Sequence, residues 1–142
     1  AAFEKRIKLC IANPGNISWG SSICEALSMA KSMPKALRPP MVDGLVRDYA
    51  WKHGVENDID AVIKELKKYD NSDILDKLTC KTLVMDASAD INPGEAKKFY
   101  DAINCPKEYM LFDDETMGQT HTQMGCYASA TERLFDWIED NL

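Results

Sequence analysis

Two short apolar runs on either side of a helical pattern constrain the fold of this chain most strongly. Residues 83–85 and 109–112 each have the length and composition of a buried strand. Between them, apolar residues recur at helical spacing as far as about Asn104, and Asn92, Pro93 and Glu95 have the order of an N-cap, a first helical residue and a capping-box acid. Strands joined by a helix pair in parallel through a right-handed crossover. The sequence therefore predicts an α/β fold.

The rest of the chain extends this pattern. Residues 7–12 form another apolar run, and the Asn-Pro-Gly sequence that follows predicts a turn at its end. Residues 17–78 change to helical spacing, which predicts a helical, cap-like segment inserted between the first and second strands. Helical patterns or helix-forming compositions cover residues 1–6, 41–53, 58–69 and 127–142. We expect a single α/β domain over residues 1–142, with about three parallel strands flanked by helices.

Charge and composition exclude several classes of function. The chain has 142 residues, 45% of them hydrophobic, which suits one globular domain. Its net charge of −6 argues against a nucleic-acid partner, because neutralising phosphates requires clustered Lys and Arg. No run of 18 apolar residues occurs, so we expect no membrane partner.

The cysteines bear on compartment and on metal binding. There are five, an odd number, and none has Cys-x-x-Cys spacing. This pattern argues against a disulfide framework and against a zinc site, and it favours a reducing cytosol. We therefore expect a cytoplasmic protein that has no metal and no cofactor.

An acid and a base follow the two strands of the C-terminal part. Asp90 comes at the end of the strand that contains residues 83–85, and His121 lies thirty-one residues later, after residues 109–112. A carboxylate at the end of a strand is placed to accept the proton of a histidine Nδ1 atom, as in a Ser-His-Asp triad. Asp is also common in turns and His in polar loops, so a purely structural role stays open for each of the two residues. No Gly-x-Ser-x-Gly sequence occurs, and the nearest candidate, residues 20–24, lacks the second glycine.

Five further residues deserve a hypothesis each. Asp86 is a second carboxylate in the Asp90 strand, and regular alternation would place both on one side. Cys126 follows His121 but lacks an elbow of its own, so we expect an inert thiol. His53 lies in the last turn of a helix, where a structural role is expected. Trp19 and Trp51 could line a substrate pocket, although aromatic residues at helical spacing are more often core.

Several stretches resemble one family. Residues 78–90 resemble the "I-x-C-P-T-L-x-L-x-G-x-x-D" strand of α/β-hydrolases, with Lys81 in place of Pro and Asp86-Ala87 in place of a small polar residue and Gly. Residues 118–125 resemble the "G-x-x-H-x-Q-x-G" histidine loop, and residues 93–100 and 106–112 resemble the helix and strand between. Residues 1–7 are similar to the helix end after the nucleophile in acylaminoacyl-peptidase-like and pseudooxynicotine-hydrolase-like serine hydrolases.

The resemblance implies a function and two site residues. By this resemblance Asp90 would be the acid and His121 the base of a serine hydrolase, and the chain would correspond to the C-terminal half of an α/β-hydrolase cut after its nucleophile. The substrate would be a small-molecule or peptide ester or amide, with peptidase, esterase and carbon–carbon hydrolase activity all open. An upstream Ser and oxyanion hole would complete the site, and the chain alone would be inactive.

The same strands allow a second interpretation of the function. A hydrolase-like fold without catalysis, serving as an interaction or regulatory module, would fit the same strands. A Gly-x-Ser-x-Gly sequence within a few tens of residues upstream of Ala1 would distinguish the enzyme from the module.

The first strand predicts the assembly state. In an α/β-hydrolase, residues 7–12 would pair with the strand that carries the nucleophile, which is missing here, and their apolar edge carries only Lys8 as a charge. We therefore expect a homo-oligomer, most simply a two-fold dimer.

Overall fold

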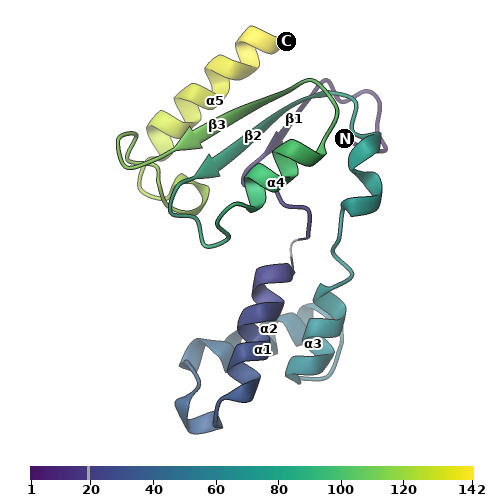
Figure 1. Cartoon of the computed structure of the whole chain (residues 1–142), viewed down its shortest axis with the longest axis vertical. Helices are drawn as coiled ribbons and strands as arrows, with labels where there is room; N and C mark the ends of the chain where they lie inside the picture. The colour runs from purple at the N-terminus through teal and green to yellow at the C-terminus, as the bar shows by residue number, and fades with distance from the viewer. Residues whose placement is uncertain (19) are drawn as a thin grey trace. The chain divides into compact units, whose positions relative to one another are not determined.

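The computed structural model describes residues 1–18 and 20–142, which form two compact units (Figure 1). Residues 1–17 and 71–142 make up the first, here named the α/β unit. Residues 18–70 make up the second, here named the helical unit. The inserted helical segment that the sequence predicts at residues 17–78 thus corresponds to a compact unit of somewhat shorter span.

The α/β unit is built on a three-stranded sheet. Its strands are β1 (Leu9–Ala12), β2 (Lys81–Ala87) and β3 (Lys107–Phe112), in the order β1-β2-β3. Both pairings are parallel, with Leu9 opposite Lys81 and Thr82 opposite Lys107 at their starts. The predicted α/β fold with a parallel sheet is confirmed. Since all three strands run the same way, the loops that follow them emerge at one edge.

Helices cover the two faces of this sheet (Figure 1). On one face, α4 (Glu95–Ala102) packs through Ala96 and Phe99 against Val84 of β2. On the other, α5 (Tyr127–Asn141) packs through Ala130 and Trp137 against alternate residues of β2 and against β3. Because both faces are covered, β2 is buried from Thr82 to Ala87, which explains its continuous apolar run.

The helical unit has its own core. It contains α1 (Ser21–Ser32), the short 3-10 helix η1 (Lys35–Leu37), α2 (Pro40–His53) and α3 (Ile59–Leu66). The Asp58 side chain accepts hydrogen bonds from the N–H groups of Asp60 and Ala61 and so caps α3. Gly54 ends α2 in the left-handed conformation, with φ of 64°. The buried residues that join the three helices are Cys24, Leu27, Val46, Ala50, Ile59, Val62 and Leu66.

Three local predictions differ from the structure. Residues 1–6 form a bend and a turn, not a helix, and the Glu4 carboxylate accepts hydrogen bonds from the Arg6 N–H and guanidinium groups. The strand predicted at residues 7–12 begins only at Leu9. α4 begins at Glu95, with Gly94 at its N-cap in the left-handed region, and not at Pro93 after an Asn92 cap. The Asn92 N–H instead donates to the Asp90 carboxylate, which holds residues 90–92 in a turn.

The remaining elements complete the α/β unit. The 3-10 helix η2 (Ser72–Lys77) leads into β2, and the 3-10 helix η3 (His121–Gln123) lies in the loop between β3 and α5. Among the residues that the structure describes, none of the helices has both the length and the apolar character that crossing a bilayer requires.

Candidate active site

Polar residues gather where the three parallel strands end. Asn13 follows β1, Asp90 follows β2, and His121 lies in the loop after β3. The carboxyl ends of parallel strands are the usual place for a site in α/β folds, because the loops there converge while the strands hold them rigidly. The edge is therefore the first place to look for chemistry.

Backbone hydrogen bonds bring the Asp90 turn and the His121 loop together. The Ser88 N–H donates to the Phe112 carbonyl, and the Ala89 N–H donates to the Gln119 carbonyl, each at 2.8 Å. Ala89 and Thr120 form a parallel bridge just beyond the sheet. These contacts fix the register of the two loops, so that the residue after Ala89 and the residue after Thr120 lie side by side.

Asp90 and His121 are in direct contact. The Asp90 Oδ2 atom lies 2.9 Å from the His121 Nδ1 atom, and its Oδ1 atom accepts the Asn92 N–H at 2.8 Å. The Asp90 side chain is 1% exposed, whereas the His121 side chain is 30% exposed. A carboxylate is only an acceptor here, so the neutral imidazole must carry its proton on Nδ1. The expected juxtaposition of the two residues is thus present in the structure.

The outer nitrogen of His121 has a different environment. Among the described residues, no group makes a hydrogen bond with the Nε2 atom of His121. With the proton held on Nδ1, Nε2 presents a lone pair. A partly exposed imidazole in this state is able to accept a proton from a neighbouring hydroxyl or thiol.

Comparison with known proteins adds no assignment. Neither the models of known protein families nor the curated proteins contain a match to this sequence.

The loop that carries His121 has an unusual backbone. Met117, Thr122 and Gln123 have positive φ values of 59°, 53° and 56°. Such conformations cost free energy in residues other than glycine, and they cluster at functional sites. Gly118 starts the loop against Phe112, where an added Cβ atom would lie 2.8 Å from the ring. Tight packing at Gly118 and the strained turn at Thr122 thus hold His121 in one position.

Gln123 links this loop to the end of β1. Its side chain is 1% exposed, and its Oε1 atom accepts a hydrogen bond of 2.8 Å from the Asn13 Nδ2 atom. No sequence pattern indicates a role for the Asn13 side chain in this site, because only tertiary structure brings residues 13 and 123 together. The Gln123 Nε2 atom is buried and has no hydrogen-bond partner among the described residues. Gln123 therefore ties the His121 loop to the end of β1.

Asp86 has a separate partner. It is 7% exposed, and its carboxylate accepts hydrogen bonds from the Tyr109 hydroxyl of β3 and from the Ala87 N–H. Burial, together with the hydrogen bond to Asp86, raises the pKa of Tyr109. Of the two carboxylates in this strand and its turn, Asp90 is the one that bonds to His121, and Asp86 ties β2 to β3.

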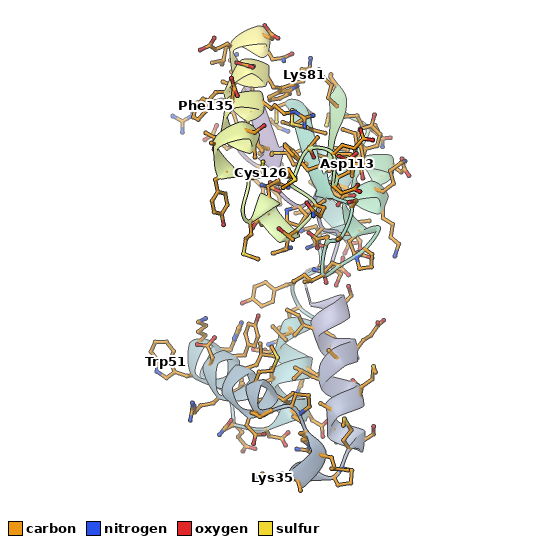
Figure 2. The ribbon with its side chains drawn as sticks, turned by 90° about the vertical axis from the view of Figure 1, so that its left-hand side faces the viewer. Lys35, Trp51, Lys81, Asp113, Cys126 and Phe135 are labelled. Carbon is orange, nitrogen blue, oxygen red and sulfur yellow. The ribbon has the colours of Figure 1, made fainter. Side chains whose placement is uncertain are left out.

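The other candidate residues lie elsewhere. The Cys126 thiol contacts the Thr116 carbonyl at 3.2 Å, at the start of α5. His53 lies in the helical unit between the Tyr49 carbonyl and the Tyr69 hydroxyl, at 2.7 and 2.9 Å. Trp51 is 80% exposed and points away from the helices (Figure 2). Trp19 lies outside the described residues. In the described part of the chain, no group of three or more His, Cys, Asp or Glu side chains is arranged to hold a metal ion.

Proposed function

We propose that Asp90 and His121 are the acid and the base of a serine-hydrolase site that acts on ester or amide bonds of small molecules or peptides. The observation that carries the proposal is the 2.9 Å contact between a buried carboxylate and a partly exposed imidazole at the carboxyl edge of a parallel sheet. The resemblance of residues 78–90 and 118–125 to the strand and histidine loop of α/β-hydrolases supports it.

Each residue has a defined part in the reaction. A serine hydroxyl attacks the substrate carbonyl carbon, and its proton passes to the His121 Nε2 atom. Asp90 holds the imidazole in the tautomer that leaves Nε2 free and stabilises the imidazolium that forms. His121 then gives the proton to the leaving alcohol or amine, and water repeats the cycle on the acyl enzyme.

The proposal assigns the nucleophile to a segment outside these residues. No Gly-x-Ser-x-Gly sequence occurs in the chain, and within the residues that the structure describes β1 is an edge strand, paired on one side only. A further parallel strand on that side would end beside Asn13, at the same edge as His121. A serine carried there, with N–H groups to bind the oxyanion, would complete the site.

The test compares this chain with the product of the whole reading frame that contains it, on a chromogenic short-chain ester. We expect no turnover by the chain alone. In the whole product, His121→Ala should lower kcat by about 10³-fold or more, as triad removals do. His53→Ala is the matched control. It replaces the second of the two histidines of this chain, which lies in the helical unit, and it should leave kcat unchanged.

Two results would contradict the proposal. One is a whole product in which His121→Ala and His53→Ala have the same small effect on kcat. The other is turnover by the chain alone that Cys126→Ala abolishes, because this would assign the nucleophile to Cys126 and not to a serine.

A non-catalytic interaction module is the second candidate, and the unpaired β1 edge favours it. The reading frame upstream of Ala1 distinguishes the two functions, because a hydrolase needs a serine nucleophile there and an interaction module does not. All five cysteines are free thiols, which supports a reducing compartment such as the cytosol for either function.

A further inference from the structure

The helical unit contains an apolar cavity of about 420 Å³ between α1 and α2. Every residue that lines it is apolar, and three are methionines, Met29, Met33 and Met41. These side chains are 70%, 38% and 74% exposed, respectively. Nearby in η1, Leu37 is 67% exposed. Single exposed apolar residues are ordinary, but four around one connection form a patch.

The size and lining of this cavity indicate the kind of ligand. Small-molecule sites have volumes of about 300–1,000 Å³ and are mostly apolar. Methionine side chains are flexible and polarizable, so they adapt their shape to an apolar ligand. With no polar side chain in its lining, the cavity suits a flexible aliphatic chain better than a sugar or a nucleotide.

A second cavity, of about 400 Å³, adjoins the same α1–α2 connection and is basic. Its lining includes Lys31, Lys35, Arg38 and Arg47, against the carboxylates of Asp43 and Asp58. Lys31 is occupied by an ion pair of 2.5 Å with Asp60. Lys35 and Arg47, however, make no ion pair within the described part of the chain. The surplus of positive charge is complementary to an anion.

The two cavities share one short segment. Met33 and Pro39 line the apolar cavity, and Lys35 and Arg38, between them in the sequence, line the basic one. The Arg38 guanidinium donates to the Met33 carbonyl at 3.2 Å, which holds it at the end of α1. Lys35 lies at the tip of this connection (Figure 2). A ligand with an apolar chain and an anionic end would thus meet the matching group at each end.

We propose that the helical unit binds a medium-chain fatty acid, with its alkyl chain among Met29, Met33 and Met41 and its carboxylate beside Lys35 and Arg38. The alkyl chain gains the free energy of removing apolar surface from water, and the carboxylate gains a charge-assisted hydrogen bond. This proposal concerns residues 18–70 alone and is independent of the roles of Asp90 and His121.

The test uses this chain with ¹³C-labelled methionine methyl groups, titrated with dodecanoate below its micelle concentration. We expect saturable shifts of the Met29, Met33 and Met41 signals. Met117 and Met124, which are 71% and 55% exposed in the α/β unit, are internal controls and should not shift. Equal shifts of all exposed methionines, or no saturable shift, would overturn the proposal.

Three variants and two comparison ligands test the two ends of the ligand separately. Met41→Gln should weaken dodecanoate binding about ten-fold, whereas Met117→Gln, a matched change at similar exposure, should not. Lys35→Gln should weaken dodecanoate binding about three- to five-fold, the effect of one exposed ion pair, and leave dodecanol binding unchanged. Dodecyltrimethylammonium should bind more weakly than dodecanoate to the unaltered chain. If it binds equally well, or if Lys35→Gln has no effect, the assignment of a fatty acid is wrong.

Discussion

The two oxygen atoms of Asp90 have different tasks, and this determines what its replacement does. Oδ1 accepts the Asn92 N–H, and Oδ2 accepts the proton on His121 Nδ1. In an Asp90→Asn variant the amide oxygen must stay on the Asn92 N–H, because that position needs an acceptor. The amide NH₂ group then faces His121 and donates to Nδ1, so the imidazole proton moves to Nε2.

We therefore predict that Asp90→Asn switches the tautomer of neutral His121 from Nδ1–H to Nε2–H without unfolding the chain. Long-range ¹H–¹⁵N correlation of the imidazole nitrogens measures this directly. His53 is an internal control, because its Nδ1 atom donates to the Tyr49 carbonyl and its tautomer should not change. An Nε2–H tautomer of His121 in the unaltered chain would refute the assignment of the Asp90 contact.

The buried Asp86 and the partly buried Tyr109 form a pair that should affect stability. Tyr109→Phe removes the hydroxyl that donates to the Asp86 carboxylate and leaves that charge short of a partner. We predict a loss of about 1–3 kcal/mol in the free energy of unfolding, measured with urea near neutral pH. Tyr127→Phe is the control, since Tyr127 is 60% exposed, and it should change stability by less than about 0.5 kcal/mol.

The same pair gives the stability a dependence on alkaline pH. The pKa of Tyr109 in the fold is raised above its ordinary value of 10.0, first by burial and then by Asp86. Above pH 10 the unfolded chain loses the tyrosine proton before the folded chain does, so this contribution to stability falls as pH rises. The difference between the unaltered chain and Tyr109→Phe should therefore shrink between pH 8 and about pH 11. A constant difference would contradict this assignment.

At the level of elements, local patterns predicted much of the fold. The parallel arrangement, the helix between β2 and β3, and α2 and α5 follow from periodicity and turn residues. Local patterns failed where a hydrogen bond outside the helix fixes the backbone conformation. Asn92 has the sequence of a helix cap, but its N–H bonds to Asp90, and the helix starts later at Glu95.

The candidate site was predictable in part for a related reason. Asp90 and His121 each follow a strand, and parallel strands deliver their loops to one edge, so their proximity could be expected. The Ala89–Thr120 bridge and the Asn13–Gln123 contact that support them could not, because they join residues far apart in sequence. Strand alternation alone does not distinguish Asp86 from Asp90. The resemblance favours Asp90, and the contact with His121 agrees with that choice.

For the whole molecule, the edge of the sheet sets the expected assembly. Ile11 of β1 is 39% exposed, and β1 carries no charged residue, whereas the opposite edge strand β3 contains Lys107 and Glu108. Charges on an edge strand discourage pairing with another chain. We predict that the chain self-associates at micromolar concentration through β1, most simply as a two-fold dimer.

Sedimentation equilibrium tests this prediction. Ile11→Lys should shift the chain to monomer, because a charge then lies on the apolar side of β1. Leu111→Lys is the matched control on β3, where the side chain is 43% exposed, and it should leave the association unchanged. A monomeric unaltered chain, or equal effects of the two substitutions, would show that the β1 edge is not the interface.

The chain enters and leaves the helical unit at adjacent positions. The Asn71 N–H donates to the Ile17 carbonyl at 2.8 Å, and Ser18 and Asp70 form an antiparallel bridge one residue further along. The 53 residues from 18 to 70 thus form an insertion whose first and last residues pair with each other. Such an arrangement makes the unit exchangeable during evolution, since a different insert, or a two-residue turn, would fit between the same two residues without altering β1 or β2. Substitutions in the helical unit and at the Asp90–His121 pair can consequently accumulate independently of each other.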